Sequence, residues 1–332
     1  MQAGGPEGSI SRSKGIVLGT GRGIALSCMQ VLDYQGPVKL TFTGLLRSAP
    51  VLVALSGAGL VAEPPGNPVA GGAPSMEMPA SVQAEAAARY SRGDWVMVWN
   101  DEFDTGTAPS PKKWGYEEGL IRNNELQYYT KGRAENARIE GGALVITGRR
   151  EDYRGSRYTS ASLNTKGRFE FTYGKVEVRA KFPTGRGTWP AIWLLGDESK
   201  GGWPRCGEID IMENVGFDPA KIHFTVHTGA FNGAQGTQKT NAVVRDRPWE
   251  DYHRYGIIWT HERIEFFLDG EKVSEFANDG LGVDHWPFDS PEYLILNLAL
   301  GGNWGGKKGV DDSIFPAEFR VDYVRVWKSP RG

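Results

Sequence analysis

The clearest pattern of polar and apolar positions is a strict alternation that recurs in short runs from Trp95 onward. Side chains alternate between the two faces of a strand, so this spacing predicts β-strands with one buried face. Asp269 and Gly270 separate two of the runs and predict a tight hairpin. Short strands bounded by Gly, Asp and Asn favour a sandwich or a barrel. The predicted strands include 143–147, 168–173, 175–182, 223–228, 254–259, 263–268, 293–300 and 319–327.

The run 207–214, GEIDIMEN, concentrates carboxyl groups on one predicted strand. Glu208 and Asp210 fall on one face, and the isoleucines between them fall on the other. Glu213 is out of phase, but one extra residue at Met212, accommodated as a β-bulge, returns it to the face of the other two acids. Carboxyls held that close resist joint ionisation, so one can keep a proton while its neighbour stays charged. The same spacing also describes the solvated face of an ordinary antiparallel strand.

Tryptophans gather around this strand in the sequence. Trp189 and Trp203 each lie beside Pro and Gly, so they are candidates for the wall of a cleft, whereas the aliphatic neighbours of Trp193 favour a place in the core. Sugars present C–H faces that stack on flat aromatic rings, and the aromatic rings are large and apolar. Paired carboxyls beside such rings indicate glycoside hydrolysis, which requires a proton donor and a nucleophile or base.

Two other strands carry candidate polar residues. Asn297 interrupts an apolar strand, and burying an unpaired amide costs a few kcal/mol, so it faces either a ligand or a hydrogen-bonding neighbour. His227 shares a face with His223 on the strand that follows the acids, and we expect it in the cleft. These two histidines lie roughly 13 Å apart along an extended strand, which argues against one shared transition metal.

Composition narrows the class of partner. The 332 residues include 45 Gly and 11 Trp, and this Gly and aromatic content favours an all-β fold. The formal net charge is −2, which argues against nucleic acid or an anionic membrane as a partner. From Trp95 onward the chain has no apolar run of 18 residues, so by that test this region is not an integral membrane protein.

The first ninety residues differ in character from the rest. We interpret residues 1–62 as an amino-terminal extension whose uncharged apolar stretch, 49–62, has the length of a signal peptide. An ordinary buried strand is the alternative for that stretch. Residues 63–92 are rich in Pro, Gly and Ala and are expected to form a flexible linker to a catalytic domain at 93–329. The predicted location is therefore secreted, extracellular or periplasmic.

Four motifs in a fixed order carry a family resemblance: GTWPAIWLLG (187–196), WPRCGEIDIMENVG (203–216), LILNLALGGNWGG (294–306) and DDSIFPAEFRVDYVRVW (311–327). Together they resemble glycoside hydrolase family 16 of the bacterial laminarinase type, over approximately Trp95 to Trp327. The resemblance implies an all-β jelly-roll sandwich of two antiparallel sheets with a concave substrate cleft. It also implies that Glu208 is the nucleophile, that Asp210 supports it and that Glu213 is the general acid/base, with no cofactor in the chemistry.

The resemblance extends to binding positions. Asn123, Glu177, Arg179 and Asn297 match positions that contact the substrate or line the cleft, although Glu177 and Arg179 could equally form an ion pair on a solvated face. Some members of the family bind one structural calcium on the convex side. The matching positions are Glu102, the backbone of Gly142 and Asp322, where oxygen ligands would suit a hard cation.

The expected protein is a secreted, monomeric, retaining endo-β-1,3-glucanase acting on laminarin-type polysaccharide. A related hydrolase of mixed-linkage β-glucan, agarose or carrageenan would use the same acids with different cleft walls. A transglycosylase is a further alternative, since transfer and hydrolysis differ only in the acceptor. A noncatalytic glucan-binding module is the alternative from another class, but such relatives lose one or both glutamates, and this chain keeps Glu208 and Glu213.

Overall fold

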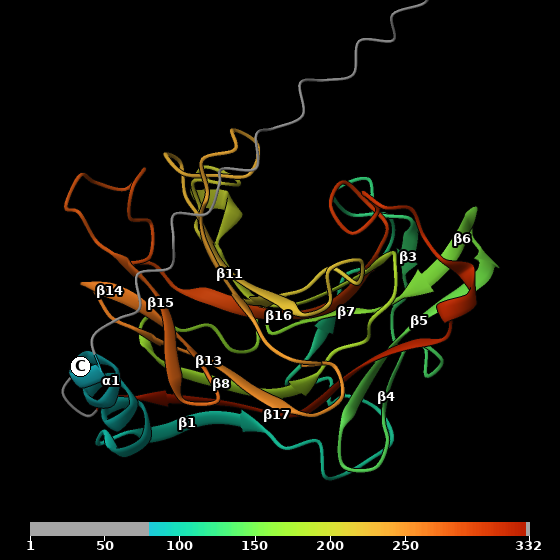
Figure 1. The fold of residues 1–332 in the computed structure, drawn as a ribbon. Helices are drawn as coiled ribbons and strands as arrows, with labels where there is room; N and C mark the ends of the chain where they lie inside the picture. Colours follow the sequence, from blue (N-terminus) through green and yellow to red (C-terminus); the bar gives the residue numbers. More distant parts are fainter. Residues whose placement is uncertain (1–79, 330–332) are drawn as a thin grey trace, which may run out of the picture. The chain divides into compact units, whose positions relative to one another are not determined.

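A computed structural model describes residues 80–329, and within this range two sheets pack face to face (Figure 1). The strand pairs are antiparallel apart from the short β3–β6 pair. This arrangement confirms the predicted sandwich of two antiparallel sheets. The ten-stranded sheet contains β1 (Val96–Asp101), β3 (Gln127–Tyr129), β4 (Ala137–Ile139), β5 (Leu144–Tyr153), β6 (Ser156–Ser160), β8 (Gly174–Lys181), β13 (His253–Trp259), β14 (Arg263–Leu268), β15 (Glu271–Ala277) and β17 (Ala317–Lys328). The seven-stranded sheet contains β2 (Gly115–Tyr116), β7 (Ser162–Asn164), β9 (Thr188–Gly196), β10 (Glu208–Glu213), β11 (Lys221–His227), β12 (Lys239–Val244) and β16 (Glu292–Leu300).

The main core lies between the sheets. Alternate residues of each strand point into it, because the side-chain period of a strand is two. In β9 and β16 these residues are aliphatic, and the opposite face of the same strands carries a second cluster of buried side chains. The second cluster contains Ala191, Trp193, Leu195, Cys206, Tyr293 and Ile295. The seven-stranded sheet therefore buries apolar side chains on both of its faces.

Most of the predicted strands are present, and the hairpin at Asp269 and Gly270 is confirmed. Both turn residues have positive φ, 53° and 89°, as a tight hairpin turn requires. The strand predicted at 168–173 is wrong, because this segment is a turn with one isolated bridge at Phe171. Its aromatic residues stack in a row instead. The centroid of the Phe169 ring lies 5.1 Å from that of Trp99 and 5.4 Å from that of Phe171. Alternation here reflects aromatic packing and not strand pairing.

The predicted linker at 63–92 needs a correction, because its last residues form a helix, α1 (Ala80–Arg92). The segment contains good helix formers, and Ala86 and Tyr90 lie one turn apart and are buried. The ring of Tyr90 stacks on Phe267 of the ten-stranded sheet with a centroid distance of 4.3 Å. The rest of the predicted linker and the extension at 1–62 lie outside the described residues. Between residues 80 and 329, no helix has the length and apolar character needed to cross a bilayer.

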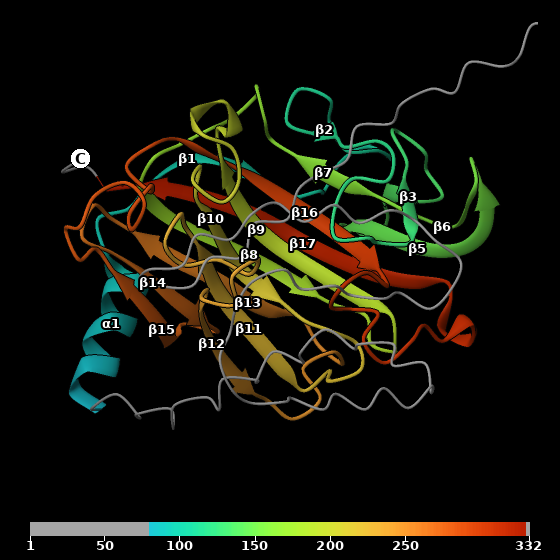
Figure 2. The same ribbon diagram turned by 90° about the horizontal axis from the view of Figure 1, so that it is seen from above.

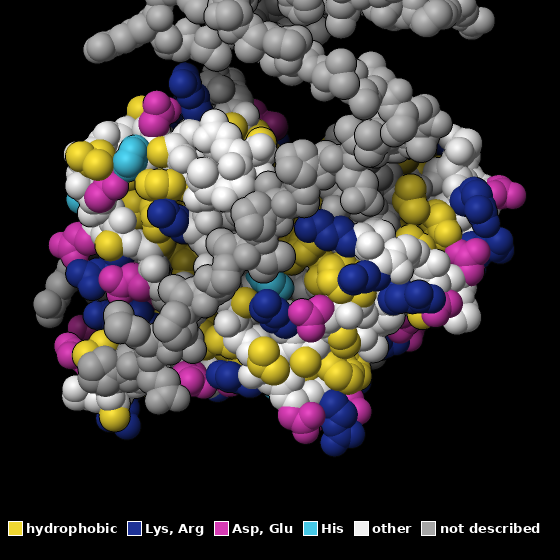
Figure 3. All heavy atoms as spheres, turned by 45° about the horizontal axis from the view of Figure 1, so that its top comes forward, with side chains coloured by type: hydrophobic (Ala, Val, Ile, Leu, Met, Phe, Trp, Pro, Cys, Tyr) yellow, Lys and Arg dark blue, Asp and Glu magenta, His cyan; other side chains and the backbone are white. Residues whose placement is uncertain are grey.

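Two single-turn 3-10 helices, Glu198–Lys200 and Asp312–Ile314, complete the secondary structure of the described range. Figure 3 shows basic and acidic side chains interspersed over the visible face. This mixture is in keeping with the small net charge of the chain.

Candidate active site

The three acids lie on β10, in the middle of the seven-stranded sheet between β9 and β11 (Figure 2). Strand register aligns each acid with one residue on either side. The three rows are Leu195, Glu208 and His227; Trp193, Asp210 and Thr225; and Ala191, Glu213 and His223. Trp193 and its alternate neighbours point away from the main core, so the acids do as well. The predicted common face of Glu208, Asp210 and Glu213 is confirmed.

The predicted β-bulge is also present. Asp210 pairs with Trp193 and Met212 with Ile192, so Ile211 has no opposite residue on β9. Ile211 and Met212 are both fully buried in the main core. Two consecutive residues therefore point inward, and this returns Glu213 to the outer face.

Glu208 is more accessible than Asp210, because 17% of its side chain is exposed, against 3% for Asp210. The indole nitrogen of Trp203 donates to Glu208 Oε2 at 2.5 Å. Trp203 itself is 42% exposed. It therefore combines an open ring face with a hydrogen bond to the proposed nucleophile, as expected for a cleft-wall residue.

Asp210 is buried, and burial raises its pKa well above the usual value. The charge of Glu208 and a hydrogen bond to it raise the pKa further. The raised pKa makes Asp210 hard to ionise beside the more accessible Glu208. This is the separation of roles that two adjacent carboxyls require.

Glu213 also has a pKa raised well above its usual value, first by burial and then by the charge of Asp210. The indole nitrogen of Trp189 donates to Glu213 Oε1 at 2.9 Å and opposes that increase. The raised pKa favours the protonated form of Glu213, and a tryptophan orients its carboxyl. The arrangement suits a general acid.

Trp304 and His223 complete the surroundings of Trp189 and Glu213, and sequence reasoning assigned no role to either. The Trp304 ring meets Trp189 edge-on at 5.4 Å and His223 at 4.9 Å. Burial lowers the pKa of His223 to about 4, so this ring is neutral beside Glu213 near pH 7. In the sequence, Trp304 is marked only by its position in the GGNWGG segment of the motif at 294–306.

His227 lies beside the other two acids, with Nε2 3.3 Å from Asp210 Oδ2 and 3.9 Å from Glu208 Oε1. These three side chains also have the mutual spacing of a metal site. However, His227 Nδ1 accepts a hydrogen bond from the Gly233 backbone, so in the neutral ring the proton is on Nε2, the nitrogen that faces the acids. A protonated nitrogen offers no lone pair to a cation, and the three residues do not fit a metal in this arrangement.

Asn297 has hydrogen-bonding neighbours, which was one of its two predicted environments. Its side-chain nitrogen donates to the Tyr129 hydroxyl at 3.0 Å, and its oxygen accepts from the Trp193 indole at 2.7 Å. Asn297 pairs directly with Ala191, which continues the row of Glu213. It therefore supports the floor of the site through Trp193, which is buried on this outer face and not between the sheets.

Asn123 is exposed, and its backbone oxygen accepts from the Asn303 nitrogen at 2.8 Å. Asn303 immediately precedes Trp304, so Asn123 adjoins the loop that reaches the acids. Its φ of 55° shows that it is also a turn former.

The family model described as glycosyl hydrolases family 16 matches residues 124–325. The chain belongs to glycosyl hydrolase family 16. A β-glucanase of Rhodothermus marinus is 50% identical over 244 residues, which cover 70% of this chain and 85% of that protein.

Solved structures agree with the family assignment. The laminarinase structure from Rhodothermus marinus has a TM-score of 0.69 at 50% identity and covers 70% of this chain and 97% of that one. A non-specific endo-β-1,3(4)-glucanase called SCLam has a TM-score of 0.68 at 48% identity, covering 71% and 92% of the respective chains. These family 16 structures confirm the predicted jelly-roll class.

The prediction that Glu177 and Arg179 line the family 16 cleft is wrong. Both lie on β8 of the ten-stranded sheet, whereas the acids lie on the seven-stranded sheet. The apolar residues of β8 face the main core, so its polar residues face away from the opposite sheet. There Glu177 accepts from the Tyr323 hydroxyl at 2.7 Å, and Arg179 pairs with Asp322 at 2.7 Å. Arg179 does form an ion pair, as in the alternative interpretation, but its partner is Asp322.

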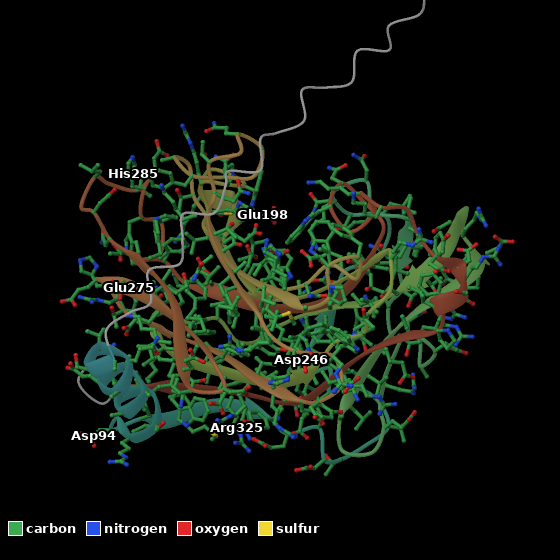
Figure 4. The ribbon with its side chains drawn as sticks, in the orientation of Figure 1. Asp94, Glu198, Asp246, Glu275, His285 and Arg325 are labelled. Atoms are coloured by element: carbon green, nitrogen blue, oxygen red, sulfur yellow. The ribbon has the colours of Figure 1, made fainter. Side chains whose placement is uncertain are left out.

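The predicted calcium ligands do not fit a cation in this arrangement. Arg325 holds both oxygens of Glu102 at 2.9 and 2.7 Å, and Arg179 holds Asp322. Gly142 lies beside Asp104 in a turn with φ of 74°. Figure 4 labels Arg325 near β1, far from the segment of Glu198 on the side of the seven-stranded sheet. Each carboxylate already has a positively charged partner, so a calcium ion would have to compete with an arginine for both.

Proposed function

We propose that this family 16 chain is a retaining endo-glucanase that hydrolyses β-1,3-linked glucan of the laminarin type. The observation that carries the proposal is the common face of Glu208, Asp210 and Glu213. The pKa values of Asp210 and Glu213 are raised, and Glu208 is more accessible than Asp210. The similarity to a laminarinase and to β-glucanases supports the substrate class.

In the first step, Glu208 attacks the anomeric carbon while Glu213 transfers its proton to the glycosidic oxygen. The bond from the anomeric carbon to that oxygen breaks, and a covalent glycosyl-enzyme forms on Glu208. Trp203 and Trp189 hold these two carboxyls in place through their indole N–H groups. Asp210 orients Glu208 through the hydrogen bond between the two carboxyls, and the charge of Asp210 favours the protonated form of Glu213.

In the second step, Glu213 is a carboxylate and takes a proton from water. The resulting hydroxide attacks the anomeric carbon, and the bond to Glu208 breaks. Glu213 is protonated again and Glu208 is a carboxylate, so both groups return to their starting states. Two displacements at one carbon retain its β configuration.

A second candidate is a broader β-1,3(4)-glucanase, because the chain is nearly as similar to the non-specific SCLam enzyme as to the laminarinase. Release of reducing ends from laminarin, lichenan, agarose and carrageenan would separate the substrate classes. Activity on laminarin alone supports the narrow proposal, and comparable activity on lichenan supports the broad one.

The catalytic assignment predicts that Glu208→Gln and Glu213→Gln each lower turnover of laminarin by at least about 10³-fold, since each removes one of two required carboxyls. Circular dichroism must show folded protein for both variants. Asp94→Asn, which changes an exposed acid that precedes β1, is the matched control and should leave turnover unchanged. A folded variant of either glutamate with more than a tenth of wild-type turnover contradicts the assignment.

The roles of the two glutamates can be separated by azide and by the anomer released. Glu213→Ala with azide should yield the β-glycosyl azide, because the intermediate on Glu208 still forms, whereas Glu208→Ala with azide should yield the α-azide. Proton NMR of the first wild-type products should show the β-anomer. Initial release of the α-anomer would refute a covalent role for Glu208.

We also propose that the enzyme is exported, on the strength of the apolar stretch at 49–62. Fractionation of cells that express the full chain, with the mature amino terminus determined by mass spectrometry, tests this. Retention of the intact sequence in the cytosol contradicts it.

A further inference from the structure

His227 is held in one tautomer by the backbone. Its Nδ1 accepts a hydrogen bond from the Gly233 nitrogen at 3.0 Å. A backbone N–H can only donate, so Nδ1 must present a lone pair. A neutral imidazole has one proton, which is therefore on Nε2.

His227 Nε2 lies near two of the acids of β10. It is 3.3 Å from Asp210 Oδ2, a buried oxygen without a hydrogen-bond partner of standard geometry among residues 80–329. The rings of His227 and Trp203 are also neighbours, with 5.8 Å between their centroids. His227 is consequently a donor close to an oxygen that needs one.

The loop at 228–237 that carries Gly233 is built around a buried side chain. Asn232 is 2% exposed and donates to the backbone oxygens of Thr228 and Gly229 at 3.2 Å, while its side-chain oxygen accepts from the Gln235 nitrogen at 3.1 Å. Its own backbone nitrogen donates to Thr237. The residue before Gly233 is thus held by hydrogen bonds of both its side chain and its backbone.

Gly233 leaves room for the His227 ring. A Cβ at this position would lie 3.2 Å from His227 Cε1, tighter than an ordinary contact, so a side chain here would shift the ring or the loop by a few tenths of an ångström. The loop therefore delivers one backbone donor to one ring nitrogen.

We propose that the loop 228–237 is a positioning device for the reaction, with Asn232 and Gly233 acting through the tautomer of His227. This inference rests on the proposed glycosidase function. With Nε2 protonated, the ring presents a donor 3.3 Å from Asp210 Oδ2, on the carboxyl that adjoins Glu208. In the other tautomer, Nε2 would present a lone pair to that oxygen, so the ring could no longer supply a donor there.

Long-range ¹H–¹⁵N NMR of ¹⁵N-histidine-labelled enzyme tests the tautomer directly, and His227→Gln identifies the signals. Wild-type enzyme should show His227 protonated on Nε2. A proton on Nδ1 in wild-type enzyme overturns the proposal. This measurement does not depend on activity, so a chain that fails to hydrolyse any glucan would refute the proposed function while the tautomer could still be read.

The functional arm uses Gly233→Pro, which removes the N–H donor, with Gln235→Ala as the control because that side chain is exposed in the same loop. In Gly233→Pro, the NMR signals of His227 should no longer show the Nε2-protonated tautomer alone. Its kcat on laminarin should fall at least about tenfold, and its KM should stay within about twofold of the wild-type value. Gln235→Ala should match wild type in both. A changed tautomer with wild-type kcat overturns the proposal. Should Gly233→Pro not fold, Asn232→Ala provides the same comparison, with the same two readouts.

Discussion

The tryptophans show how one residue type takes different roles at the same face. The indole nitrogen of Trp203 donates to Glu208, that of Trp189 donates to Glu213, and that of Trp193 donates to Asn297. Sequence reasoning placed Trp189 and Trp203 in a cleft wall through their apolar rings. It did not predict that the N–H groups would hold the reacting carboxyls, because side-chain direction depends on loop geometry.

Trp203 variants can separate these two contributions. Trp203→Phe keeps an aromatic ring but removes the N–H donor, so kcat on laminarin should fall about 10- to 100-fold with little change in KM, the cost of a hydrogen bond to a charged group. Trp203→Ala should also raise KM, because the ring face is lost. Trp95→Phe removes an indole donor to the Arg89 backbone elsewhere and serves as the control. Wild-type kcat in Trp203→Phe would show that the indole bond has no part in catalysis.

Glu292 is a buried acid that the proposed reaction does not use. It is fully buried, and neither carboxyl oxygen has a hydrogen-bond partner among the described residues. Burial raises its pKa well above the usual value, and the charge of Glu208 raises it further. The folded protein therefore keeps Glu292 protonated at pH values where the unfolded chain has released the proton.

This difference in pKa makes the stability of the folded protein depend on pH. The contribution of Glu292 to the free energy of unfolding is fully present below the pKa of the unfolded chain, close to 4.5, and is lost as pH rises through the pKa of the folded protein. A difference of one pKa unit between the two states corresponds to about 1.4 kcal/mol. Relative to wild type, Glu292→Gln should gain stability from pH 4 to pH 8 in urea unfolding. Glu262→Gln, at a side chain 76% exposed, should show no such trend. Parallel curves for wild type and Glu292→Gln would contradict the expectation.

At the scale of elements, Tyr90 is the aromatic side chain that packs α1 on the ten-stranded sheet, where Arg89 also pairs with Glu265. Tyr90 is 2% exposed and stacks on Phe267, and its backbone oxygen accepts from Lys175 Nζ at 2.7 Å. A Cβ on Gly256 would lie 2.1 Å from the Tyr90 hydroxyl, so this glycine makes room for the ring. With only Ala86 and Tyr90 buried, the helix has too narrow an apolar face to be recognised by periodicity.

Tyr90→Ala should therefore lower the free energy of unfolding by about 3 kcal/mol, since a large buried ring is removed. Its kcat and KM on laminarin should equal those of wild type, because β8 and β13 lie in the sheet opposite the acids. Thermal unfolding and the laminarin assay measure the two quantities. Val82→Ala, at a 42% exposed position of the same helix, is the control. A loss of activity in folded Tyr90→Ala would show that α1 affects the site.

At the scale of the whole molecule, the sequence predicted the two-sheet sandwich and the common face of the three acids. These succeeded because alternation reports directly on strand faces, and the bulge follows from the phase of Glu213. Assignment of residues to sheets failed for Glu177 and Arg179, because alternation states that a strand has a polar face but not which sheet it joins. The role of Gly233 was also beyond reach, since it depends on a backbone atom brought to His227 by a loop.

The bulge in β10 has a consequence for how this chemistry can change. Glu208 lies opposite Leu195 and Glu213 opposite Ala191, so the two glutamates are four residues apart on β9 although they are five apart on β10. The bulge absorbs the additional residue, because Ile211 and Met212 both point into the core. Deletion of one of these two residues would give a regular strand with both glutamates still on one face, whereas a further insertion would turn Glu213 toward the core. The face that carries the acids therefore tolerates a change of strand length in one direction only.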